Sequence, residues 1–126
     1  MDIFDFQCRC NKFQCEIAYP NPRLVNLIHR IEMRYGEEIV ITSGKRCKSH
    51  NEDIGGHKNS RHCSGTAVDC YIPNIPHNDL YNWLSSTNHI LGLGLYDTHV
   101  HIDIRHTPAR WDNRTEKVNA ELRTSQ

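Results

Sequence analysis

The clearest hydrophobic periodicity of the chain lies between residues 23 and 35. Apolar residues recur there at the i, i+3, i+4, i+7 spacing of an amphipathic helix, at Leu24, Leu27, Ile28 and Ile31. Pro22 precedes this stretch and Gly36 follows it, and these residue types are common at the start and just beyond the end of a helix. The pattern predicts a helix over 23–35. A second helix is predicted over 78–86, with Asn78 as its cap, from the helical spacing of Leu80, Trp83 and Leu84.

Three segments have the residue pattern of strands. Residues 38–42 are rich in β-branched side chains and end at a Ser-Gly turn, and residues 67–72 alternate before a proline. The clearest alternation runs from residue 96 to residue 105, after Gly92 and Gly94. One face of this predicted strand carries the apolar residues Val100, Ile102 and Ile104. The other face carries the polar residues Asp97, His99, His101, Asp103 and Arg105.

These elements predict one small α+β domain over residues 1–126. We expect an antiparallel sheet that carries a functional site on one face, with the two helices packed against the other face. Residues 1–20 are rich in cysteine and aromatic residues and have no clear periodicity, so they are expected to form an N-terminal arm. The length of 126 residues suits a single core and makes two independent domains improbable.

Charge and hydropathy exclude two classes of partner. Fifteen Lys and Arg residues balance 15 Asp and Glu residues, and no basic run provides the surface that duplex nucleic acid requires. No apolar stretch reaches the roughly 18 residues needed to cross a membrane. We therefore expect neither nucleic-acid binding nor membrane insertion, and we expect a monomer.

Nine histidines and a polar, glycine-rich segment over 43–66 indicate metal chemistry. His62 lies at the end of this segment and Asp69 lies in the following strand, so a turn at Gly65 can bring both side chains to one point. His101, on the strand over 96–105, can supply a third ligand. Two imidazoles and one carboxylate, with a fourth position left for water, form the catalytic type of zinc site.

The same residues resemble a known family. Residues 60–69, SRHCSGTAVD, are similar to the S-x-H-x-x-G-x-A-x-D signature of the zinc D-alanyl-D-alanine carboxypeptidases and their endopeptidase relatives, which share the hedgehog/DD-peptidase fold. Residues 92–96, GLGLY, and 100–103, VHID, resemble the second half of that signature. Further matches in the same order are the SGKR segment over 43–46 and, in the loop that follows it, Asn51 with Gly55 and Gly56.

The resemblance implies a role for several residues. It makes His62, Asp69 and His101 the zinc ligands and Arg46 the cation that faces the substrate, where a guanidinium can bind a carboxylate or stabilise an oxyanion. Asn51 and Ser60 are expected to contact substrate as well. Asp103, two residues after His101, is expected to hydrogen-bond a ligand rather than to bind the metal itself.

The general base has two candidates. Family members supply an acidic residue or a histidine shortly before the last ligand, but Thr98 stands three residues before His101 in this chain. In an extended strand His99 would lie about 7 Å from His101, whereas Asp97 would lie about 14 Å away. We therefore favour His99 and keep Asp97 as the alternative, which a bend after Gly94 could bring inward.

The six cysteines have more than one reading. Cys8, Cys10 and Cys15, with Cys47 as a further donor, could bind a second, structural zinc ion, although C-x-C-x4-C is not a standard spacing. Separate reduced thiols or a single disulfide are the alternatives. Cys70, beside Asp69 in a predicted strand, should point away from the site and into the core.

The favoured function is a zinc metallopeptidase of the D-alanyl-D-alanine carboxypeptidase or endopeptidase type. Its expected substrate is a D-amino-acid-containing amide bond of bacterial peptidoglycan, in a stem peptide or a cross-link. Because the first residues lack the features of a signal peptide, we expect synthesis in the cytoplasm and action on the cell wall after release, as in lysins, or after assisted export. The alternatives are a zinc-stabilised, hedgehog-like binding module without hydrolytic activity and an amidase acting on another substrate.

Overall fold

The computed structural model describes residues 6–9, 20–44, 46, 51–52, 54–56, 60–63 and 65–115. The elements bounded within them are, in chain order, α1 (Pro22–Tyr35), β1 (Val40–Ser43), β2 (Ala67–Tyr71), α3 (His77–Ser86), β3 (Leu91–Leu95), β4 (Val100–Ile104) and β5 (Ala109–Asp112). The predicted α+β class is confirmed: a five-stranded sheet is combined with helices. Among the described residues, no helix is both long enough and apolar enough to cross a bilayer.

Helix α1 forms where the apolar periodicity predicts it. Pro22 is its first residue, and the Asn21 side chain accepts a hydrogen bond from the Arg23 backbone N–H at 2.8 Å. Gly36 ends the helix in the left-handed conformation with φ 65°, which glycine adopts without steric cost. The apolar stripe that defined the helix is buried, at Leu24, Leu27, Ile28 and Ile31.

Helix α3 also forms, but the predicted cap at Asn78 is wrong. The helix begins at His77, and Pro76 occupies the capping position without a side-chain hydrogen bond. Proline fixes its own φ near the value that a chain entering a helix needs, here −58°. The helix cap therefore lies two residues before Asn78.

The sheet is mixed rather than wholly antiparallel, which corrects the sequence prediction. Its strand order is β1-β2-β4-β3-β5, and every neighbouring pair is antiparallel except β3 with β5. The four residues between β4 and β5 carry the chain past the start of β3. Strand β5 therefore runs along the outer edge of β3 in the same direction as β3.

The strand predicted over 96–105 is shorter than expected. Strand β4 begins at Val100, and residues 96–99 form the turn that joins it to β3. Strand β3 itself, with the sequence LGLGL, and the edge strand β5 were not predicted. Strand β3 pairs with β4, and β5 pairs with β3. The two strands extend the sheet face that carries the polar residues.

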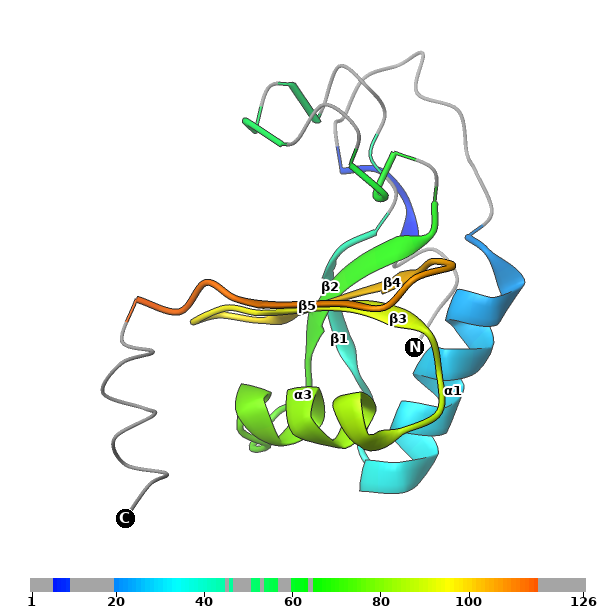
Figure 1. Cartoon of the computed structure of the whole chain (residues 1–126), viewed down its shortest axis with the longest axis vertical. Coiled ribbons are helices and arrows are strands. Elements are labelled where there is room, and N and C mark those ends of the chain that lie inside the picture. The colour runs from blue at the N-terminus through cyan, green and yellow to red at the C-terminus, as the bar shows by residue number, and fades with distance from the viewer. Residues whose placement is uncertain are drawn as a thin grey trace.

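Helices α1 and α3 lie on one side of the sheet, and the described parts of residues 46–63 lie on the other (Figure 1). Between the helices and the sheet is a core of aliphatic side chains, including Val68, Leu93, Val100 and Ile102, each fully buried. Each such side chain stabilises the fold by about 1.5–3 kcal/mol. Phe6 also joins the core at 1% exposure, so the N-terminal segment is anchored there. The rest of the expected arm over 1–20 lies largely outside the described residues.

Candidate metal centre and active site

The site is built on one row of residues that crosses the sheet from strand to strand. In register, Ser43 of β1 faces Asp69 of β2, Asp69 faces His101 of β4, and His101 faces Gly94 of β3. Gly94 in turn faces Trp111 of β5. Because side chains alternate along each strand, this row projects to the face opposite the core. The sheet thus brings together residues that are up to 68 positions apart in the sequence.

The glycines of β3 make room for the side chains of the neighbouring strands. A Cβ atom at Gly94 would overlap the indole of Trp111, and a Cβ atom at Gly92 would overlap the carboxylate of Asp103 and the guanidinium of Arg105. The leucines of the same strand point to the core, where all three are buried. The glycines of β3 therefore leave space for neighbouring side chains on the site face, and its leucines pack in the core on the other face.

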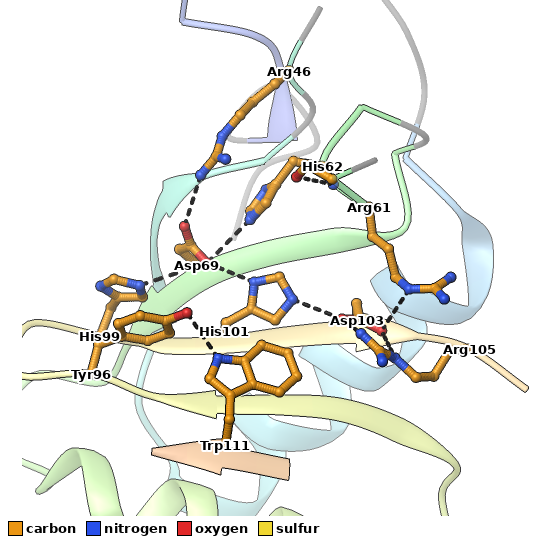
Figure 2. Close-up of a pocket in the computed structure, with 11 residues that line it drawn as sticks. Arg46, Arg61, His62, Asp69, Tyr96, His99, His101, Asp103, Arg105 and Trp111 are labelled. Atoms are coloured by element: carbon orange, nitrogen blue, oxygen red, sulfur yellow. Dashed lines mark hydrogen bonds and ion pairs between the residues drawn. The ribbon is translucent and has the colours of Figure 1, made fainter. Parts of the chain in front are cut away.

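His62, Asp69 and His101 converge on one point, as Figure 2 shows. One candidate ligand atom from each residue lies within 4.8 Å of the other two. The Oδ1 atom of Asp69 is 3.2 Å from His62 Nε2 and 3.0 Å from His101 Nδ1. The turn that returns His62 toward β2 contains Gly65 at φ 75°, the conformation expected of the glycine in this position.

Each imidazole is oriented by a hydrogen bond on its outer side. His62 Nδ1 lies 2.7 Å from the Gly44 carbonyl oxygen, and His101 Nε2 lies 2.8 Å from Asp103 Oδ2. Donation of these N–H groups leaves His62 Nε2 and His101 Nδ1 as the free lone pairs, and both face Asp69. This donor set and its outer hydrogen bonds fit a zinc ion held by two imidazoles and one carboxylate.

Asp103 is the buried anchor of this arrangement. It has no exposed surface, and Arg105 donates to both of its oxygens at 2.6 Å (Figure 2). Arg61 approaches the same carboxylate from the other side, at 3.7 Å. Burial opposes the charged form of Asp103, but the hydrogen bonds from Arg105 and His101 outweigh it and lower the pKa to about 2. Asp103 is therefore an anion that holds the His101 ring.

The electrostatics around Asp69 favour positive charge. Burial alone would raise the pKa of Asp69, but its close contacts with the imidazoles of His101 and His62 lower it well below its usual range. Burial alone would lower the pKa of His101, and its contacts with Asp103 and Asp69 instead raise it. A cation between these three side chains is thus stabilised by the residues that surround it.

Arg46 lies beside the three residues, and a network of side chains holds its guanidinium. Arg46 Nη2 donates to Asp69 Oδ2 at 3.1 Å, Nη1 donates to Asn51 Oδ1 at 3.3 Å, and Nε donates to Ser43 Oγ at 3.2 Å. Asn51 is only 3% exposed, does not line the cavity and contacts Arg46. Its contact with substrate stays a prediction. Ser60 does line the cavity, and its hydroxyl accepts from the His62 backbone N–H.

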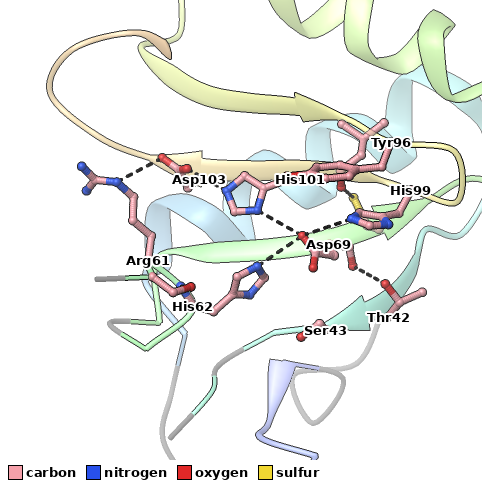
Figure 3. Close-up of polar contacts among 12 residues, drawn as sticks. Thr42, Ser43, Arg61, His62, Asp69, Tyr96, His99, His101 and Asp103 are labelled. Atoms are coloured by element: carbon pink, nitrogen blue, oxygen red, sulfur yellow. Dashed lines mark hydrogen bonds and ion pairs between the residues drawn. The ribbon is translucent and has the colours of Figure 1, made fainter. Parts of the chain in front are cut away.

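The two candidates for the general base are placed differently. His99 lines the cavity with its Nε2 atom 3.8 Å from Asp69 Oδ1, while its Nδ1 atom is 2.9 Å from the Thr98 hydroxyl, as Figure 3 shows for the ring and Asp69. Burial lowers the pKa of His99 and so favours the neutral ring. The Asp97 carboxylate is exposed and accepts hydrogen bonds from Thr115, away from the cavity. The geometry favours His99.

Four residues that the sequence analysis did not assign to the site line the same cavity, which has a volume of about 560 Å³: Arg61, Tyr96, Arg105 and Trp111. Trp111 Nε1 donates to the Tyr96 hydroxyl at 2.8 Å, and the Tyr96 ring stacks on His99 at 4.5 Å. Tyr96 is the last residue of the GLGLY segment, and this position in the family motif is the only sequence feature that indicated a role for it. The aromatic pair forms an apolar wall beside the polar ligands.

Comparison with protein families decides the classification. A family model described as Peptidase M15 matches residues 2–103, most of the chain. The chain belongs to the Peptidase M15 family. A comparison with curated proteins gives no match. Membership supports a metallopeptidase with zinc as its cofactor, and in this Peptidase M15 chain the residues that could hold the ion are His62, Asp69 and His101.

The cysteines contribute no described metal cluster. Among the described residues, Cys8 and Cys63 are half-buried and Cys70 is buried, and none is in a disulfide. Cys10, Cys15 and Cys47, which the structural zinc hypothesis requires, lie outside the described residues. Cys70 packs in the core as predicted, where burial raises the pKa of its thiol far above its usual range.

The contact between Asp103 and His101 gives a first prediction. Asp103→Asn keeps the side-chain shape but removes the charge that orients the ligand, so zinc affinity should fall roughly 10–100-fold. Competition with a chromophoric chelator measures this change. The matched control is Asp97→Asn, which alters an exposed carboxylate bonded to Thr115 and should leave the affinity unchanged. Equal affinities for wild type and Asp103→Asn would contradict the role given to Asp103.

Proposed function

We propose that this chain is a zinc-dependent peptidase that hydrolyses a D-amino-acid-containing amide bond of bacterial peptidoglycan, in a stem peptide or a cross-link. The observation that carries the proposal is the convergence of His62, Asp69 and His101 at the floor of an open cavity. Membership of the Peptidase M15 family supports both the reaction class and the link to peptidoglycan. A lysin-like or wall-modifying enzyme is the biological role that we propose.

Zinc bound by the three side chains would polarise the scissile carbonyl and make the attacking water more acidic. His99 Nε2 faces the same point and can accept a proton in the tautomer whose Nδ1–H donates to the Thr98 hydroxyl. Stacking on Tyr96 fixes the plane of the His99 ring. His99 can then donate the proton that it accepted from the attacking water to the leaving amine.

Arg46 supplies the fixed positive charge of the proposed reaction. Its guanidinium is largely buried, with 13% of the side chain exposed, and it is held by Ser43, Asn51 and Asp69. A guanidinium held in this way can bind a peptide carboxylate or carbonyl oxygen without first losing conformational freedom. We propose that it binds the substrate next to the scissile bond and stabilises negative charge that develops there.

Intact peptidoglycan provides the test. Purified protein should release defined peptide fragments from the wall material, and a chelator should stop the release until zinc is added back. Mass spectrometry of the fragments identifies the bond and shows whether cleavage is of the carboxypeptidase or the endopeptidase type. Zinc-loaded protein that binds wall material but releases nothing would instead support the hedgehog-like binding module.

A further inference from the structure

A second cavity opens on another part of the molecule. It has a volume of about 470 Å³, close to that of the candidate active site, and it lies between α1, residues 88–91 and the segment that follows β4. Its apolar lining includes Leu27, Leu91 and Ile104. The proposed reaction uses none of these three apolar residues.

The polar lining of this cavity is cationic. Arg23 and Arg30 stand on one face of α1, at positions i and i+7, and His89 and His106 approach from the loops. The Nη1 atom of Arg30 lies 3.5 Å from His89 Nε2, which accepts a hydrogen bond from it. Arg105, which donates to Asp103 and also lines the first cavity, lines this cavity as well. No aspartate or glutamate is among the described residues that line it.

Arg23 and Arg30 lack the aspartate partner that three other described arginines have. Arg46 is paired with Asp69, Arg105 with Asp103 and Arg114 with Asp112. In the described part of the chain, neither the Arg23 nor the Arg30 guanidinium has a carboxylate partner. For a protein with no net charge, two such arginines beside two histidines concentrate positive potential in one concave site.

We propose that this second cavity binds a phosphate group. A tetrahedral phosphate presents oxygen atoms in several directions and can accept from donors on separate segments at once, as α1 and the two loops provide here. A planar carboxylate would be satisfied by one guanidinium. Asn26 and Asn88 add neutral donors to the lining, and the apolar side chains can contact the carbon skeleton that carries the phosphate. The group could come from free phosphate or from a phosphodiester-linked polymer.

The test is an NMR titration of the zinc-loaded, ¹⁵N-labelled chain at constant ionic strength, with inorganic phosphate, a short oligo(glycerol phosphate) and acetate as probes. Phosphate should shift the amide signals of Leu27, Ile90 and Leu91 along a saturable curve. The amides of Asp69 and His101 report separately on phosphate that binds at the other cavity. Tighter binding of the oligomer identifies a polymer as the source, and equal binding identifies the free ion.

Variants decide whether the arginines form the site. The double variant Arg23→Gln/Arg30→Gln should weaken phosphate binding by roughly tenfold or more. Arg34→Gln, on the same helix but outside the cavity, should change it less than about twofold. Peptide hydrolysis should be the same in both variants, which separates this inference from the proposed function. Unchanged phosphate binding in the double variant, shifts that grow linearly with concentration, or equally tight binding of acetate would overturn the proposal.

Discussion

The His101→Ala variant is expected to lose zinc binding and all metal-dependent hydrolysis while it stays folded. The substitution removes one of three converging donors and leaves the Asp69 and Asp103 carboxylates without their shared partner. Catalytic zinc sites use three protein ligands, and the variant retains only two of them. The loss of affinity should therefore exceed the roughly 10–100-fold that outer hydrogen-bond partners contribute.

Elemental analysis of the purified chain and chelator competition measure this effect directly. Wild type should carry one equivalent of zinc, and a second equivalent would support the structural site at the N-terminal cysteines. The matched control is His29→Ala, which removes an exposed imidazole on α1 and should leave the zinc content unchanged. Circular dichroism shows whether each variant is folded. A folded His101→Ala protein that retains a full equivalent of zinc would refute the proposed ligand set.

Sequence patterns predicted the elements whose apolar residues follow a clear period. Helix α1 and strand β2 bury the side chains that defined them, such as Ile28 and Val68. Strand β3 escaped prediction because Gly92 and Gly94 replace the polar side chains that normally complete an alternating pattern. Their small size is explained only when Trp111 and the Arg105–Asp103 pair are seen to fill the space above them. Packing between neighbouring strands of this kind produces no hydrophobic pattern in the sequence of the strand itself.

The site was predicted in part, for a related reason. Gly65 and the motif around His62 and Asp69 indicated that these two side chains meet, because that information lies within ten consecutive residues. The contact between Asn51 and Arg46 depends instead on where a buried amide points. The distance given to Asp97 assumed an extended strand, whereas residues 96–99 form a turn. The sequence motif thus predicted which residues come together. Which of their side chains face the cavity depends on the folded backbone.

The His99→Ala variant is expected to keep its zinc and to lose about 10²–10⁴-fold in kcat, the usual contribution of a positioned general base. The reason is the placement of His99 Nε2 at 3.8 Å from Asp69 Oδ1, outside the set of three ligands but facing the same point. Measured zinc affinity should stay near that of wild type. This combination distinguishes loss of a proton acceptor from loss of the metal.

The alternative base is tested in parallel with Asp97→Asn, measured on the same peptide substrate. Its carboxylate accepts from the backbone and the hydroxyl of Thr115, so its removal should alter the turn between β3 and β4 only locally and leave kcat within about twofold. Should Asp97→Asn abolish turnover while His99→Ala keeps it, the roles of the two residues are reversed. The turn would then have to bring Asp97 inward when substrate binds, a movement of the segment that also carries the stacked Tyr96 and His99 rings.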